Sequence, residues 1–158
     1  MILAIDPGNI ESAYVILDKN LKPIKFGKIS NYHLVDMLRK GDFNNAYPIE
    51  HFAIEMIANM GMSAVGRTLF DTCVWIGRFI EAYKLSYSYI YRREEKINLC
   101  GTMKAKDGNI RQALIDRFGV VGTKKSPGWF YGVSKDVWAA IAVGVTYHDM
   151  YLNKRDVG

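Results

Sequence analysis

Runs of apolar residues at the start of the chain predict three short strands. Residues 2–6 (ILAID) form an apolar run that ends on an acid, and residues 12–18 (SAYVILD) and 22–30 (KPIKFGKIS) are also strand-like. A turn at Lys19-Asn20 joins the second run to the third. Because connections this short join neighbouring antiparallel strands, we expect a three-stranded antiparallel meander.

Helix-like and strand-like segments alternate along the rest of the chain. We expect helices at residues 32–40 (ending at Gly41), 63–84, 94–99, 109–118 and 135–151, the last with Ser134 as its candidate N-cap. Strands are expected at 50–57 and 87–91, and loops at 41–48 and 119–132. This order predicts a single α/β domain over residues 1–158, with a mixed sheet flanked by helices, as in the ribonuclease H-like fold.

Three acidic residues lie near the ends of these elements. Asp6 ends the first strand, Glu55 lies near the end of the apolar strand FAIE, and Asp136 lies in the first turn of the last helix. Alternation places Glu55 on the strand face opposite Phe52 and Ile54. Carboxylates that converge in this way repel one another, and two Mg²⁺ ions between them would relieve the repulsion and activate water for phosphodiester hydrolysis.

Each acid also has an ordinary structural explanation. Asp6 precedes Pro7-Gly8 and could form a turn, Glu55 could be paired with a cation, and Asp136 could complement the helix dipole. The nuclease hypothesis therefore depends on all three acids together, beside a basic segment.

The basic residues are concentrated in one segment. The chain has 158 residues and a formal net charge of +5. Residues 91–125 contain nine cations, namely Arg92, Arg93, Lys96, Lys104, Lys106, Arg111, Arg117, Lys124 and Lys125, against four anions, Glu94, Glu95, Asp107 and Asp116. This segment alone carries an excess of five positive charges. It is either a solvated basic face or a surface for a polyanion, of which nucleic acid is the commonest.

Composition excludes several other classes of protein. The longest apolar stretch, residues 137–147, is shorter than the ~20 residues that span a bilayer. No basic segment precedes the first apolar run, as a secretory signal would require. Cys73 and Cys100 have neither metal-site spacing nor a disulfide framework. We therefore expect a cytoplasmic protein with reduced cysteines and no membrane partner.

Three segments resemble one family of nucleases. AIDPGN at residues 4–9, FAIEMI at 52–57 and AAIAVGVTYH at 139–148 are similar to the RuvC family of Holliday junction resolvases, in particular its smaller phage-type members. Between them, YRREEKINLCG and KAKDGNIRQAL occupy the place of the family's basic, junction-contacting stretch. The resemblance covers almost the whole chain, in order and at similar spacing.

The resemblance implies a homodimeric, Mg²⁺-dependent endonuclease that nicks four-way and other branched DNA, with Mn²⁺ as a substitute and no small-molecule cofactor. Asp6, Glu55 and Asp136 would be its catalytic and metal-binding acids. The expected DNA-binding residues are Arg92, Arg93, Lys96, Lys104, Lys106, Arg111, Lys124 and Lys125. If the chain is phage-encoded, it would act in the cytoplasm of a host bacterium. The helix at 63–84 would be the dimer helix, with Phe70, Trp75 and Phe79 costly to expose on a monomer.

Two positions depart from the family's pattern. Ala139 stands where a fourth Asp usually follows one helical turn after the third, and Asp149 is too far along the helix to replace it. Three acids could suffice, the register could be shifted, or the chain could be an inactivated variant. Ala58, followed by Asn59 and Met60, stands where bacterial members insert an aromatic residue, so we expect a looser specificity that includes forks and flaps.

Two rival hypotheses remain open at this point. A protein of the actin and sugar-kinase class also begins with an Asp-x-Gly turn, and Asp107-Gly108 could form its second phosphate loop. However, Asp107 follows a lysine-rich stretch that is not a strand, and the chain is short for a two-lobed clamp. The other rival is a DNA-binding module without catalysis, for which Ala139 is the best argument.

Overall fold

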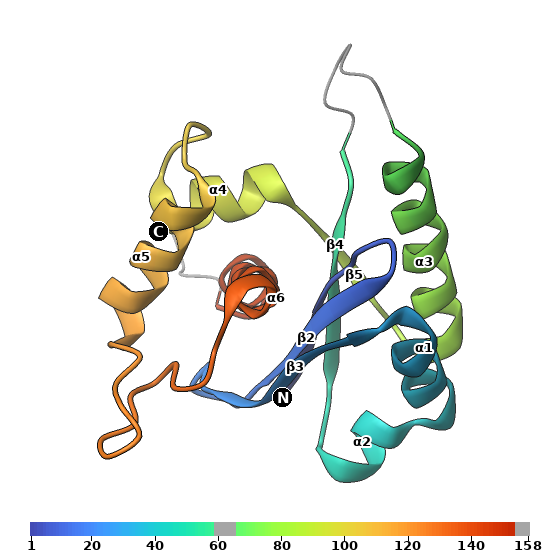
Figure 1. Ribbon diagram of the computed structural model, residues 1–158, viewed down its shortest axis with the longest axis horizontal. Coiled ribbons are helices and arrows are strands. Elements are labelled where there is room, and N and C mark those ends of the chain that lie inside the picture. Colours follow the sequence, from blue (N-terminus) through green and yellow to red (C-terminus); the bar gives the residue numbers. More distant parts are fainter. Residues whose placement is uncertain (59–65, 154–158) are drawn as a thin grey trace.

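A five-stranded mixed sheet forms the centre of the molecule (Figure 1). The computed structural model describes residues 1–58 and 66–153. The strands are β1 (Ile2–Asp6), β2 (Glu11–Leu17), β3 (Pro23–Ser30), β4 (His51–Met56) and β5 (Ser88–Tyr91), in the spatial order β3-β2-β1-β4-β5. The first three strands are antiparallel, whereas β4 is parallel to β1 and β5 is parallel to β4. The predicted meander and mixed sheet are therefore confirmed.

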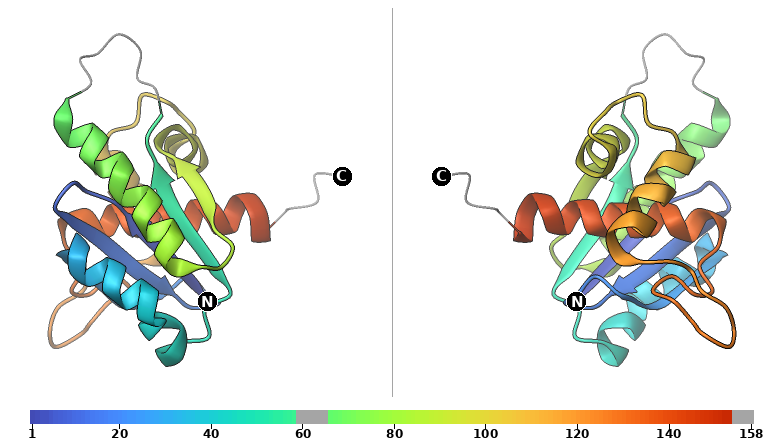
Figure 2. Two further views of the ribbon diagram at one scale, coloured as in Figure 1. Left: turned by 90° about the vertical axis from the view of Figure 1, so that its right-hand side faces the viewer. Right: turned by 90° about the vertical axis from the view of Figure 1, so that its left-hand side faces the viewer.

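Helices cover both faces of the sheet. On one side lie α1 (Asn31–Lys40), α2 (Asp42–Ala46) and α3 (Arg67–Tyr83), and on the other α4 (Arg92–Cys100), α5 (Asp107–Phe118) and α6 (Lys135–Tyr147), which continues into a π-helical turn, η1 (His148–Leu152). Figure 2 shows α6 crossing its face of the sheet, with α5 packed beside it. The segment after β5 therefore lies on the same side as α6.

Alternation along the strands divides the core into two clusters. Phe52 and Ile54 of β4 pack with α1 and α3, whereas Ala53 faces α6. Val137 and Ile141 of α6 are buried in that second cluster, together with alternate residues of β1 and β2. This is the arrangement that period-two alternation predicts for a strand buried on both faces. It also places Glu55 on the α6 side.

Gly144 allows α6 to lie very close to the sheet. A Cβ atom at this position would be 2.6 Å from Cδ1 of Leu17 and 3.2 Å from Cβ of Ala4. Both values are below ordinary van der Waals separation, so a larger residue would push the helix outward or displace Leu17. Close packing at this point fixes the height of α6 above β1 and β2.

Several predicted boundaries were wrong. Residues 41–48, predicted as a loop, contain α2, which buries Phe43 against the sheet. The predicted long helix at 63–84 begins within the described residues at Arg67, and positions 63–65 lie outside them. α4 and α5 each begin two residues earlier than predicted. Ser134 occupies the N-cap position of α6, but its side chain makes no capping hydrogen bond.

The aromatic residues of α3 divide between the core and the surface. Trp75 and Phe79 are buried, whereas Phe70 is 61% exposed and Val74 beside it is 62% exposed. α1 and the sheet thus cover Trp75 and Phe79 within the chain, and of the three aromatic residues Phe70 is the one left exposed. Among the described helices, none has the length and apolar character required to cross a membrane.

Candidate functional site

Asp6 and Glu55 lie side by side at the ends of two neighbouring parallel strands. Residues 2–5 of β1 pair in register with residues 51–54 of β4, so the two acids come next, on the α6 side of the sheet. Their carboxyl groups lie close enough for each to influence the pKa of the other. Burial, followed by the charges of Glu55 and Asp136, raises the pKa of Asp6 to about 8. Burial also raises the pKa of Glu55, although the positive charge of Arg92 opposes this rise. Both acids are therefore harder to ionise than ordinary surface carboxyl groups.

Asp136 approaches Asp6 from the first turn of α6. The two acids line one cavity of about 320 Å³, together with residues 7–11 and Lys28 of β3. Nζ of Lys28 lies 2.5 Å from Oδ2 of Asp136 and 3.9 Å from Oε2 of Glu11. The structure thus brings all three predicted acids to one end of the sheet, with Asp6 between the other two and Asp136 paired to a lysine.

A buried hydrogen-bond network fixes the turn after Asp6. The backbone N–H of Gly8 donates to Oγ of Ser12 at 3.1 Å, and that hydroxyl donates to Oδ1 of Asn31 at 2.6 Å. The side chain of Asn31 in turn donates to the carbonyl of Gly8 at 2.8 Å. A Cβ atom at Gly8 would lie 2.3 Å from the carbonyl oxygen of Glu11, so only glycine fits. The Pro-Gly sequence therefore forms a rigid turn that holds Asp6 in place.

Glu95 is a fourth acid beside the site, and the sequence reasoning missed it. Its side chain is completely buried, and its pKa is raised to about 9 by burial, followed by the charge of Glu55, with a further contribution from Asp6. In the sequence it appeared only as one anion within the basic segment. Its spacing from Leu99, which packs against the core, could have placed it on the inward face of α4.

Arg92 lies among the acids rather than on an open surface. Its guanidinium pairs with Asp107 at the start of α5 and lies 3.5 Å from Oε2 of Glu95. Its charge also counteracts the upward pKa shifts of Asp6 and Glu55. We therefore assign Arg92 to the interior of the site, although the sequence placed it with the DNA-binding cations. Asp107 begins a helix and does not form the strand turn that the kinase-like rival needs.

Comparisons with known proteins find the same architecture elsewhere. Two Thermus thermophilus structures match over nearly the whole chain, namely RuvC in complex with a Holliday junction substrate (TM-score 0.66, 12% identity, 95% of each chain) and RuvC by itself (TM-score 0.65, 14% identity, 94% of this chain and 95% of that one). This chain has the RuvC fold. No protein-family model and no curated protein sequence matches it. The predicted ribonuclease H-like class is thereby confirmed.

The donor chemistry of the site suits a hard divalent cation. Carboxylate oxygens are the ligands that Mg²⁺ and Mn²⁺ prefer, and both oxygens of Glu95 are buried without a hydrogen-bond partner among the described residues. Within residues 1–58 and 66–153, however, no three His, Cys, Asp or Glu side chains lie close enough together to hold one metal ion. Among the described residues, the site therefore has suitable donors but not three of them around one point.

Seven predicted DNA-binding cations other than Arg92 lie on the α4–α6 side or its loops. Arg93 is exposed and Lys96 is half-buried on α4, and exposed side chains follow at Lys104, Lys106, Arg111, Lys124 and Lys125. None of the seven forms an ion pair within the described part of the chain. Only Arg111 has an aromatic partner, the ring of Trp138 at 5.0 Å. These charges remain available to an anionic partner.

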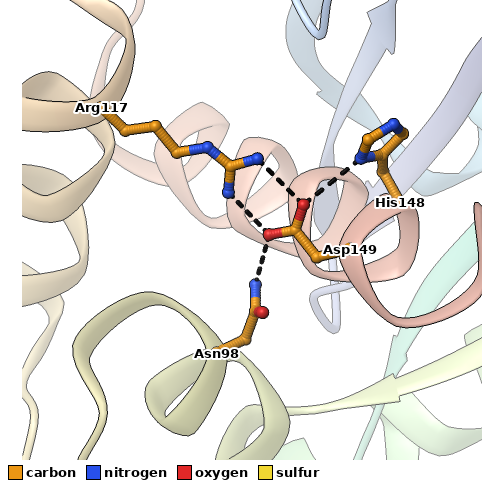
Figure 3. Close-up of polar contacts among 4 residues, drawn as sticks. All are labelled: Asn98, Arg117, His148 and Asp149. Carbon is orange, nitrogen blue, oxygen red and sulfur yellow. Dashed lines mark hydrogen bonds and ion pairs between the residues drawn. The ribbon is translucent and has the colours of Figure 1, made fainter. Parts of the chain in front are cut away.

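Asp149 connects three elements far from the acid cluster (Figure 3). Its two oxygens accept hydrogen bonds from both terminal nitrogens of Arg117 at 2.6 and 2.9 Å, and Oδ2 also accepts from Asn98 at 2.8 Å. Nδ1 of His148 lies 3.3 Å from the other oxygen. Burial opposes ionisation here, but these hydrogen bonds hold the pKa of Asp149 below its ordinary value. Asp149 therefore joins α4, α5 and η1 and is unavailable to the site.

Proposed function

We propose that this chain is a divalent-metal-dependent endodeoxyribonuclease that nicks Holliday junctions and other branched DNA. One observation carries the proposal: Asp6 and Glu55 come at the ends of neighbouring parallel strands of a RuvC-fold sheet, and Asp136 lines the same cavity as Asp6. Acids that lie near one another in this way repel each other when they are charged, and cations relieve that repulsion. Mg²⁺, with Mn²⁺ as its substitute, is the cation that oxygen donors suit best.

The roles of the residues follow from their positions. Asp6 and Glu55 would bind the cation through their carboxylate oxygens, and Asp136 would exchange its ion pair with Lys28 for the same site. When two divalent ions are bound, they supply an activated water and neutralise the leaving oxygen of the phosphodiester. Lys28, released from Asp136 on the rim of the cavity, would then face the DNA phosphate.

The basic segment supports branched DNA as the substrate. Seven cations without ion pairs would contact phosphates, which supplies affinity but not sequence specificity. A Thermus thermophilus protein with the same fold has been solved with a Holliday junction. Paired cuts across a four-armed junction need two sites related by symmetry. We infer that the exposed face of α3, with Phe70 and Val74, forms the homodimer contact, because aliphatic and aromatic side chains so exposed favour burial.

A DNA-binding module without catalysis is the second candidate. The observation that favours it is the lack of a three-ligand group within the described residues, together with Ala139 in place of an acid. Such a protein would bind a four-way junction with the same salt dependence but leave both strands intact in Mg²⁺ and in Mn²⁺.

A nicking assay on a synthetic four-way junction separates the two candidates. We expect wild-type protein to cut the junction in Mg²⁺, to spare a linear duplex of the same arms, and to lose activity in chelator. Asp6→Asn should abolish cutting but leave binding intact, whereas the matched control Asp36→Asn, on the exposed side of α1, should cut normally. Binding without cutting by the wild type would leave the second candidate.

A further inference from the structure

Glu95 is the buried ionisable group whose surroundings are hardest to explain. Its side chain has 0% exposure, yet neither carboxylate oxygen has a hydrogen-bond partner among the described residues. Within the described part of the chain, its ion-pair partner is Nη1 of Arg92, 3.5 Å from Oε2, and this contact is not a hydrogen bond. Buried polar atoms in folded proteins are nearly always hydrogen-bonded. An exception of this kind therefore needs an explanation, and a bound ion is one.

The path of the chain explains why Glu95 faces the acids. In the pairing of β4 with β5, Glu55 lies opposite Ile90. α4 starts two residues after Ile90, and Glu95 lies one turn into that helix, on the side that faces the sheet. Its carboxylate comes close enough to Glu55 and Asp6 for their charges to interact. Glu95 thus approaches the acids from the β4–β5 side, whereas Asp136 lines the cavity beside Asp6.

We propose that Glu95 is the fourth carboxylate of the cation site, supplied by α4 rather than by α6. This inference rests on the proposed function. Four acids would offer two pairs of donors, Asp136 with Asp6, which line one cavity, and Glu55 with Glu95. Such an arrangement provides two carboxylate ligands for each of two divalent ions. Without Glu95, the second ion would have Glu55 as its single carboxylate ligand.

A purely structural role for Glu95, as the counter-ion of Arg92, accounts for the contacts less well. Arg92 already hydrogen-bonds to Asp107, and it approaches Glu95 only at ion-pair distance. A dedicated counter-ion would accept a hydrogen bond from the guanidinium, because charge-assisted pairs are strongest in that geometry. Arg92 instead places its charge between the acids, where it compensates part of their repulsion until a cation binds.

Mn²⁺ binding to the full chain without DNA tests the inference independently of cleavage. Mn²⁺ would be counted by electron paramagnetic resonance during titration of the purified wild type and of three variants. We expect Glu95→Gln to weaken Mn²⁺ binding by about tenfold or more, since changes even to indirect partners of a metal have that effect. Glu95→Asp keeps the charge beside Arg92 but withdraws the carboxylate by one methylene, and should also weaken binding. Glu94→Gln is the matched control on the same helix, because an amide oxygen can still accept the N–H of Tyr91.

The outcomes separate the possible failures. Equal Mn²⁺ affinity in the wild type and Glu95→Asp, or a Glu95→Gln variant that fails to fold while Glu95→Asp binds normally, would overturn the inference and leave Glu95 as a counter-ion. If the wild type binds Mn²⁺ and cuts junctions but the Glu95 variants match it, only this inference fails. If the wild type binds no Mn²⁺, the proposed metal-dependent nuclease fails with it.

Discussion

The raised pKa of Asp6 should make the stability of the cation-free protein depend on pH. The pKa of Asp6 is raised from 3.8 to about 8, first by burial and then by the charges of Glu55 and Asp136. A group with a higher pKa in the folded chain binds protons more tightly there than in the unfolded chain. The free energy of unfolding therefore falls as the pH rises from about 4, and it levels off once Asp6 ionises in the folded state near pH 8.

The size of this effect can be worked from the same shift. At about 1.4 kcal/mol per pH unit, the interval from 3.8 to pH 7 amounts to at most ~4 kcal/mol. Asp6→Asn removes the ionisable group but leaves an amide in its place. We therefore expect the free energy of unfolding at pH 7 to rise by roughly half of this amount, about 2 kcal/mol. For a chain of 158 residues, this corresponds to a rise of about 4–8 °C in the melting temperature.

Thermal unfolding followed by circular dichroism, with chelator present, measures this effect at pH 5 and pH 8. The wild type should be less stable at pH 8, and Asp6→Asn should show a flatter dependence and the higher melting temperature at pH 8. The control Asp36→Asn should keep the wild-type slope, because the hydrogen bond from Lys40 holds the pKa of Asp36 below its ordinary value and outside this interval. An Asp6→Asn variant that melts below the wild type at pH 8 would refute the reasoning.

Three further substitutions test other parts of the molecule. Lys96→Ala should weaken binding to a four-way junction and reduce the slope of log affinity against log salt by about 0.9, the value for one phosphate contact; an unchanged slope would exclude Lys96 from the DNA surface. Asp149→Asn should lower the free energy of unfolding by about 1–3 kcal/mol in a urea titration, because Arg117 loses its charged acceptor. An equally stable variant would show that this contact is dispensable. Phe70→Glu should convert a dimer to a monomer in sedimentation velocity, and an unchanged sedimentation coefficient would exclude the exposed face of α3 as the dimer contact.

Local patterns of apolar and polar residues predicted much of the fold. Apolar runs and short connections predicted the meander, and the alternation of Phe52, Ala53 and Ile54 correctly divided β4 between two clusters. The pattern failed where burial depends on a single residue. α2 was missed because its sequence, DFNNA, is polar except for Phe43 and Ala46, and only the folded sheet supplies the pocket for Phe43.

Local sequence patterns also predicted part of the site. Asp6 and Glu55 end apolar strands, which is a signal that a sequence carries by itself. Glu95 and Arg92 have no such signal, because they look like two members of a mixed-charge helix, and only the packing of α4 shows that they point inward. The turn network of Ser12 and Asn31 joins residues 19 positions apart and likewise needs the tertiary fold.

The absence of a side chain at Gly144 has a consequence for how this protein can change. Gly144 lies eight residues after Asp136, which along a helix is about 12 Å. Because α6 is one continuous helix, the close packing of Gly144 on Ala4 and Leu17 also sets how near the first turn of the helix comes to Asp6. Replacements in this apolar interior should therefore be screened by their effect on turnover as well as on folding. Substitutions at positions 4, 17 and 144 are therefore constrained by the approach of Asp136 to Asp6, although none of the three residues belongs to the site.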